Sequence, residues 1–286
     1  MKTKNRYFIL GITTGAILML LLIGIVIAAP VFSASSFLAS LAARSTPTPP
    51  PGELIPLKPI EDLNSLNATV KLDVNGLING ERAQGSLNVD LTTNENGNSR
   101  ISVTGDLLGD IAAQVGGSLV GLFTPSSVDI YKVPTGSYIV VNSLLPVCIK
   151  PKTGKTSAAL DEMSPQSLLS MLTSSDAAIG KLVGQENFNG VPVKHYVING
   201  EAFLAAAKKS SNPKLRDFSK TLWSAEDADL YVDAKGGYPV AYSGSFSGIY
   251  EPLKFEGDYD VQIELTGVNT NTAVNLPASC KKPITP

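Results

Sequence analysis

The sequence predicts an α+β domain in which a strongly curved antiparallel β-sheet dominates and helices are few. Three observations support this fold class: runs in which apolar and polar residues alternate, Gly- or Asn-containing turns between those runs, and a small number of segments with helical periodicity. Alternation with period two is the pattern of a strand that has one buried face and one wet face. Short turns favour consecutive hairpins, so we expect neighbouring strands to pair antiparallel.

The clearest strand is FEGDYDVQIELT, residues 255–266, in which two sets of side chains point to opposite faces. The apolar set is Phe255, Tyr259, Val261, Ile263 and Leu265, and the polar set is Glu256, Asp258, Asp260, Gln262 and Glu264. The same alternation recurs in residues 70–74, 87–91 and 101–104. The turns INGERAQG, NENGNS, PTG, FNG and AKGG carry Gly or Asn, the residues that most easily adopt a positive φ.

Helical segments are fewer. Residues 164–177, SPQSLLSMLTSSDA, begin with a serine cap and a proline at the first helical position. Residues 200–211 and 213–223 predict a second helical region, which Pro213 interrupts. Residues 107–123 space apolar side chains four apart, but their paired glycines weaken a helix. We expect this last segment to be a buried helix or a mobile cover of the sheet.

A charge-free apolar run from Tyr7 to Ala29 follows a basic tail, residues 1–6. The run exceeds the roughly 20 residues that are needed to cross a bilayer. The basic tail places the N-terminus in the cytoplasm, so we expect a single-pass anchor in the cell membrane with the rest of the chain extracytoplasmic. The alternative is a cleaved signal peptide and a secreted domain, although the run is long for a signal core.

Residues 30–58 are predicted to be a proline-rich linker, because STPTPPPGELIPL favours extended polyproline II and cannot form a packed core. The folded domain is then expected to span residues 59–286. From residue 53 onward the chain carries 19 basic and 25 acidic residues, a net charge of −6. An acidic outer domain argues against nucleic acid and against anionic lipid surfaces as electrostatic partners.

The two cysteines, Cys148 and Cys280, lie far apart in the sequence and neither is part of a CxxC pair. An oxidising compartment allows them to form a disulfide, which we predict. The alternative is two unrelated buried thiols. A metal site would require more ligands than two cysteines and one histidine provide at this spacing, so no metal or other cofactor is expected.

The order of three motifs resembles a known group of proteins. GQENFNGVPVKHYVI, residues 184–198, is followed by a helical segment with a tryptophan and then by ADLYVDAKGGYPVAYSGSF, residues 228–246. This order resembles the LppX/LprA/LprF/LprG group of bacterial cell-envelope lipoproteins, whose fold is similar to the carriers LolA and LolB. The resemblance covers roughly residues 68–268 and contains no catalytic signature. The chain departs from the group because a predicted membrane span replaces the lipid-modified cysteine.

What the resemblance implies is a half-barrel: a half-open, strongly bent antiparallel sheet with helices over its concave face. It also implies an apolar cavity for acyl chains between the sheet and the helices. If the helical segments cover the concave face, their apolar side chains are the candidates for ligand contact. These candidates are Ile111, Val115, Leu119, Leu168, Leu172 and Phe203.

His195 is the single histidine of the chain. In VPVKHYVI, alternation puts it on one strand face with Val191, Val193 and Val197. A functional interpretation makes it a base or a metal ligand. We favour a structural role, in which its ring nitrogens bond to backbone or side-chain partners, since the sequence offers no second histidine and no adjacent nucleophile motif.

The enzyme motifs that occur are incomplete. SNPK, Ser211 to Lys214, and KTG, Lys152 to Gly154, match two motifs of serine β-lactamases, but they occur in the wrong order and the S-D-N motif is missing. GSFSG, Gly244 to Gly248, has a phenylalanine where a nucleophile elbow has serine. We therefore expect no enzyme.

Two hypotheses on function remain. The first is a membrane-anchored extracytoplasmic binding protein that holds a lipid or other apolar molecule for carriage or sensing. The alternative is an adhesive or scaffolding ectodomain, without a cavity. The sequence does not separate them, because cavity walls and packed cores have the same composition, and it identifies no protein partner.

Overall fold

The computed structural model describes residues 52–78, 80–108, 125–151, 178–250, 255–270 and 272–285. Within them, one 13-stranded sheet has the order β1-β8-β9-β11-β12-β13-β2-β3-β4-β5-β6-β7, with β10 beside β12. The strands are β1 (Glu53–Leu54), β2 (Leu66–Ile78), β3 (Glu81–Thr93), β4 (Ser99–Thr104), β5 (Ser127–Val133), β6 (Gly136–Asn142), β7 (Val147–Ile149), β8 (Ile179–Phe188), β9 (Val191–Ile198), β10 (Leu222–Ala225), β11 (Ala228–Asp233), β12 (Pro239–Tyr250) and β13 (Phe255–Val268).

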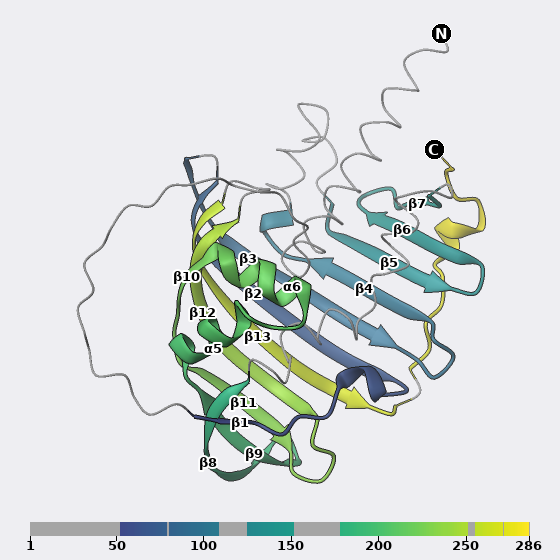
Figure 1. Cartoon of the computed structure of the whole chain (residues 1–286). Helices are drawn as coiled ribbons and strands as arrows, with labels where there is room; N and C mark the ends of the chain where they lie inside the picture. Colours follow the sequence, from purple (N-terminus) through teal and green to yellow (C-terminus); the bar gives the residue numbers. More distant parts are fainter. Residues whose placement is uncertain are drawn as a thin grey trace.

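The sheet is antiparallel, bent and open, and helices α5 (Gly200–Ala207) and α6 (Pro213–Thr221) lie over its hollow side (Figure 1). The prediction of an α+β fold on a strongly curved antiparallel sheet is therefore confirmed. The alternation predicted for residues 255–266 is also confirmed, because the apolar side chains of β13 are buried and most polar ones are exposed.

A row of side chains crosses the hollow, inner face of the sheet from β8 to β7. Each residue of this row is the register partner of the next one on the neighbouring strand. The row, which we call the inner row, is Leu182, Tyr196, Leu230, Tyr242, Ile263, Val70, Val89, Val103, Val128, Val141 and Val147. It contains no charged residue, so the pairing register alone makes one apolar face out of eleven strands.

A second row on the same face consists of small residues where the sheet is most crowded. Gly248, Gly257, Gly76 and Ala83 are successive register partners on β12, β13, β2 and β3. A Cβ atom on Gly257 would lie 2.5 Å from the backbone oxygen of Asn75. Glycine therefore allows strands β13 and β2 to approach each other closely, as a sharply bent sheet requires.

The two described helices start where the sequence predicts. The Asn199 side chain caps α5 by accepting a hydrogen bond of 2.9 Å from the amide of Ala202, and Pro213 is the first residue of α6. The prediction that the second helix continues to Trp223 is wrong. Leu222 pairs with Gly248 and begins β10, so pairing with the sheet ends the helix at Thr221.

The folded part of the chain includes residues that the sequence assigned to the linker. Strand β1 pairs with the start of β8, and the amide of Ile55 donates to the Ala178 carbonyl at 2.9 Å. Ile55 is buried, and the amide of Lys58 donates to Gly237 at 2.8 Å. The prolines of this stretch suggested a stalk, whereas its apolar residues pack on the domain. The predicted helix at 164–177 lies outside the described residues, and so does the predicted helix at 107–123 except for its first two residues.

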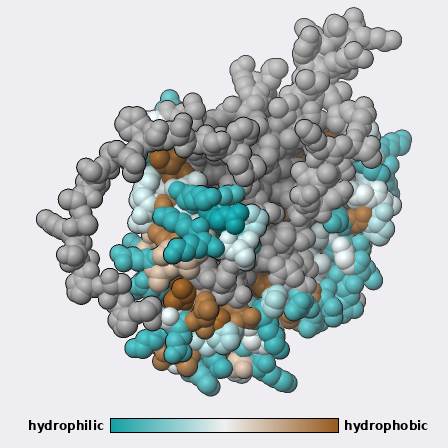
Figure 2. Space-filling model, in the orientation of Figure 1, coloured by the Kyte–Doolittle hydropathy of each residue, from teal (hydrophilic) through white to brown (hydrophobic). Residues whose placement is uncertain are grey.

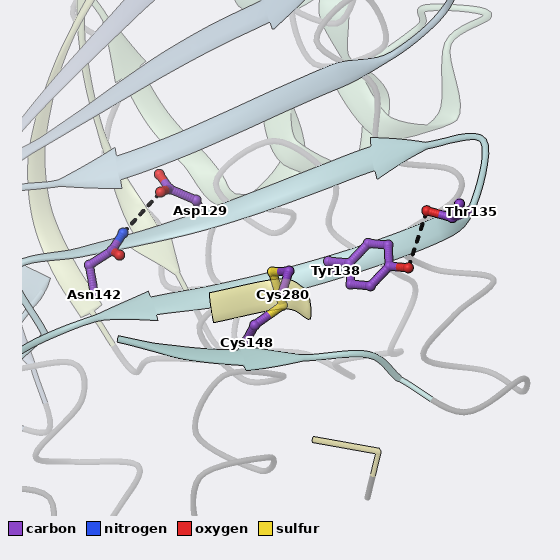
Figure 3. The surroundings of a disulfide bond; sticks show 6 residues. All are labelled: Asp129, Thr135, Tyr138, Asn142, Cys148 and Cys280. Atoms are coloured by element: carbon purple, nitrogen blue, oxygen red, sulfur yellow. Dashed lines mark hydrogen bonds between the residues drawn. A yellow bond between two sulfur atoms is a disulfide. The ribbon is translucent and has the colours of Figure 1, made fainter. Parts of the chain in front are cut away.

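A smaller apolar cluster lies on the outer face of the sheet. The C-terminal segment crosses β5 to β7 there, and Val274 and Cys280 pack with Tyr131, Tyr138, Val140 and Cys148. Cys148 on β7 and Cys280 on η4 (Ala278–Lys281) form a disulfide, with their Cα atoms 5.1 Å apart (Figure 3). The predicted disulfide is confirmed. It joins the C-terminal segment to the edge strand β7.

Removal of the disulfide is expected to destabilise the domain. The bridge closes a loop between residues 132 positions apart. In a chain-entropy model, a loop of this length stabilises the folded state by about 5 kcal/mol, and by less if the native bond is strained. The double variant Cys148→Ser/Cys280→Ser should lose up to this free energy in urea unfolding. Alkylation of both cysteines in unreduced, denatured wild-type protein would contradict the bridge.

Addition of one methyl group at Gly257 is expected to destabilise the sheet. Its Cβ would meet the Asn75 oxygen at 2.5 Å and the Cα atom of Gly76 at 2.6 Å, and neither backbone atom can turn away. Gly257→Ala should lower the free energy of unfolding by about 1–3 kcal/mol, the usual range for overpacking. Gly184→Ala on β8 is the matched control, because no atom lies within 4 Å of its Cβ position. Equal unfolding midpoints for the two variants would contradict this role of Gly257.

Candidate functional site

The candidate site is the inner face of the sheet, because it combines a concave shape with an apolar surface. Among the described elements, α5 and α6 make their main contacts with β8, β10 and β12, at one flank of this face. The inner row continues from there over β13, β2, β3, β4, β5 and β6. The apolar inner face therefore extends over more strands than the two described helices contact.

Three phenylalanines join the helices to the sheet. Phe203 of α5 lies 5.8 Å from Phe246 of β12 between ring centroids, and Phe218 of α6 lies 6.4 Å from the same ring. Phe203 is only 6% exposed. The structure thus places Phe203, a predicted ligand-contacting residue, in direct contact with the sheet. The other predicted contacts, Ile111, Val115, Leu119, Leu168 and Leu172, lie outside the described residues.

Tyrosines supply polar atoms to this apolar face: Tyr196 and Tyr242 in the inner row, and Tyr259 on β13. Tyr242 of the inner row and Tyr259 of β13 are both buried in the main core. Burial raises the pKa of both hydroxyls above the ordinary value for tyrosine. The hydroxyls therefore stay protonated and neutral at physiological pH, and a neutral tyrosine hydroxyl can donate to a carbonyl or an ester oxygen. Sequence alternation identified the face of Tyr259, and nothing in the sequence separated either tyrosine from other core residues.

Residues 53–60, at the start of the described chain, cover the flank of the inner face that lies opposite β7. Ile55 and Ile60 belong to the main core, and the Ile55 side chain lies 3.0 Å from the Cβ position of Gly180 on β8. Figure 2 shows apolar side chains gathered along β1 below α5, beside the hydrophilic surface of α6. Sequence reasoning missed this cover, because the prolines masked an apolar signal in GELIPL.

His195 lies on the outer face of the sheet, away from the candidate site. Its Nε2 atom is 2.7 Å from Oδ1 of Asp229 on β11, and its Nδ1 atom is 3.1 Å from Oε1 of Glu186 on β8. Its ring stacks on the ring of Tyr231, with centroids 4.5 Å apart. The ring of Phe188 also stacks on Tyr231, with centroids 4.9 Å apart. Both ring nitrogens face a carboxylate, which is the structural role that the sequence analysis favoured.

The His195 contacts link the β8–β9 hairpin to the neighbouring strand β11 on the outer face of the sheet. At the hairpin turn, the Asn189 side chain donates to Glu264 of β13 at 2.5 Å, so the turn reaches across several strands. Glu186 and Asp229 are nine residues before and 34 residues after His195. These partners could not be predicted from residue order, because only the sheet register brings the three strands together.

Within the described ranges, no group of three or more His, Cys, Asp or Glu side chains is arranged to hold a metal ion. In the same part of the chain, no helix is long and apolar enough to cross a bilayer, and the apolar run at residues 7–29 lies outside it. Of the two β-lactamase-like motifs, KTG also lies outside the described residues.

Solved structures of similar fold are found among bacterial lipoproteins and the LolA superfamily. No protein-family model and no curated protein matches the chain. Among solved structures, LprF of Mycobacterium bovis is similar at 12% identity and a TM-score of 0.40, over 77% of this chain and 91% of LprF. Lipoprotein LppX of Mycobacterium tuberculosis is similar at 15% identity and a TM-score of 0.37, over 76% and 91%. A LolA superfamily protein of Nitrosomonas europaea is similar at 9% identity and a TM-score of 0.22, over 76% and 89%.

Proposed function

We propose that this protein is a membrane-anchored extracytoplasmic binding protein that holds a lipid or another apolar molecule on the inner face of its curved sheet. The observation that carries the proposal is the inner row, an uncharged apolar face, mostly buried, that continues over strands beyond those contacted by α5 and α6. The proposal assigns carriage or sensing to the protein and no catalytic step.

The chemistry of the inner face suits an acyl chain. Burial of each CH₂ group contributes about 0.8 kcal/mol, so a long chain can be held without any charged contact. The neutral hydroxyls of Tyr242 and Tyr259 offer hydrogen bonds to the ester end of such a ligand. Phe203 packs directly on Phe246, which leaves no cavity between α5 and that flank of the sheet. This contact favours the alternative, an adhesive or scaffolding domain without a cavity.

Lipid occupancy tests the proposal. The domain, released by protease cleavage in STPTPPPG and kept free of detergent, should show added lipid mass in native mass spectrometry. Tyr242→Phe should lower the occupied fraction for esterified lipids by roughly tenfold, because a ligand hydrogen bond is lost. Tyr138→Phe on the outer face is the matched control, since its hydroxyl donates to Thr135 at 3.1 Å. His195→Gln should leave occupancy unchanged.

Two outcomes of that experiment would contradict lipid binding. One is a ligand-free mass that no added lipid shifts, which supports the scaffolding alternative. The other is loss of occupancy on His195→Gln while Tyr242→Phe has no effect, which would move the site to the outer face.

Membrane anchorage is a separate part of the proposal and has its own test. The run from Tyr7 to Ala29 carries no charge, so the intact protein should sediment with membranes and resist extraction by alkaline carbonate. Protease cleavage in STPTPPPG should then release the domain. Recovery of a fully soluble mature chain that begins near Ser35 would instead show that the run is a cleaved signal peptide.

A further inference from the structure

The turn between β6 and β7 exposes two consecutive leucines. Leu144 is 97% exposed and Leu145 is 72% exposed, the two highest values among the large hydrophobic residues that the structure describes. Single exposed leucines are ordinary on protein surfaces, but two adjacent ones at the tip of a turn expose a concentrated apolar surface. We call residues 143–146 the leucine turn.

The leucine turn stands on a well-bonded base. Ser143 Oγ donates to the Leu145 carbonyl at 3.0 Å, which closes the turn. At its foot, the Asn142 side chain donates to Ser127 Oγ at 2.8 Å and to Asp129 at 2.9 Å. The disulfide at Cys148 fixes the strand that follows. The two leucines are therefore held out by the fold.

The leucine turn is also uncharged, although the domain as a whole is acidic. The sequence from Tyr138 to Ile149 contains no Asp, Glu, Lys or Arg. The nearby carboxylate of Asp129 is buried and forms an ion pair with Arg100 at 3.1 Å. The apolar tip is thus surrounded by serine, asparagine and proline, so neither attraction to nor repulsion from lipid headgroup charges dominates there.

Other exposed apolar residues lie toward the same end of the sheet. The end of β6 points in the same direction as the ends of β2 and β12, whereas the β3–β4 turn lies at the opposite end. Val141 of β6 is level with Val70 of β2, so β2 and β12 continue beyond the leucine turn. Leu77 near the end of β2 is 43% exposed. Trp223 is 53% exposed on β10, whose Leu222 pairs with Gly248 near the end of β12. Tryptophan and leucine are the residues that favour a membrane interface.

We propose that the leucine turn inserts into the surface of a phospholipid bilayer and docks this end of the sheet there. The inference rests on the proposed function, because a bound lipid has to enter from a membrane or leave to one. A second copy of the chain fits the leucine turn less well than a bilayer does. Two leucine side chains bury far less than the about 800 Å² per partner of a standard protein interface, and the tip protrudes where a stable interface needs a broad patch.

The predicted anchor lets the leucine turn reach the membrane. Residues 30–51, between the apolar run and the described domain, span at most roughly 75 Å when extended. A domain of this size has a radius of gyration of roughly 17 Å, so either end of the sheet lies within reach of the bilayer. The linker is therefore long enough for either end of the sheet to touch the bilayer, and the apolar leucine turn determines which end binds.

Depth-dependent quenching tests the proposal on the full chain in phosphatidylcholine vesicles. Leu144→Cys takes one fluorescent label, because both native cysteines are bridged. Lipids that carry a spin label near the headgroup should quench the fluorescence of the label at position 144, since interfacial residues insert about 5–10 Å into the bilayer. Glu95→Cys in the β3–β4 turn is the matched control and should keep its emission, because it lies at the opposite end of the sheet.

A second pair of variants separates insertion from mere proximity. A label on Ser126→Cys, next to the leucine turn, should be quenched in the parent chain but not in Leu144→Asn/Leu145→Asn, where the apolar drive is removed. Equal quenching at positions 144 and 95, or unchanged quenching of position 126 in the double asparagine variant, would overturn the proposal. Disulfide cross-links between copies of the Leu144→Cys variant, without lipid quenching, would also overturn it and assign the turn to a protein interface.

The two proposals fail separately. A protein that carries no lipid in native mass spectrometry but shows quenching at position 144 would refute lipid carriage and support insertion of the turn. A protein that carries lipid with no quenching at position 144 would do the reverse. The double asparagine variant should keep full lipid occupancy, because the turn is remote from Tyr242 and Tyr259 in the sheet order.

Discussion

The structure depends on the pairing register of the sheet. One residue of slip on any strand would turn its apolar side chains to the outer face and break the inner row. The register is fixed most strongly at the centre, where β2, β3 and β13 pair over 13 residues each. From there, the inner row extends to Leu182 on one side and to Val147 on the other. The candidate binding face is therefore a consequence of the same pairing that folds the domain.

Curvature comes from a different set of residues. The glycines at 76, 248 and 257 leave room for close backbone approach, and the ring of Phe255 lies within 3.0 Å of the Cβ positions of Gly76 and Gly257. Larger residues at these points would push the strands apart and flatten the sheet. On the outer face, the disulfide ties the C-terminal segment to β7, and the His195 contacts join β8, β9 and β11.

The sequence was sufficient for features that depend on local periodicity. It predicted the strand at 255–266, the start of α6 at Pro213 and the face of His195, because each follows from residue order alone. It also predicted the disulfide, from compartment and cysteine count. It failed where distant residues decide the outcome: β1 forms because β8 offers an edge, Trp223 leaves the helix because Gly248 pairs with its neighbour, and Glu186 and Asp229 meet His195 through register. Of the ligand-contacting residues that it predicted, Phe203 is the one that the structure describes.

The two flanks of the inner face are held with unequal strength, and this bears on how a binding face can coexist with a packed core. At the β7 flank, a covalent bridge and the outer cluster around Tyr131 and Tyr138 secure the last strands. At the β8 flank, β1 contributes two residues, and single backbone hydrogen bonds from Ile55 and Lys58 hold the segment over the sheet. Segments with few hydrogen bonds open at lower free energy than the rest of a domain, and here the buried side chains of Ile55 and Ile60 oppose that opening. A ligand on the inner row would add contacts to apolar side chains of this same core, so its binding would stabilise the folded domain.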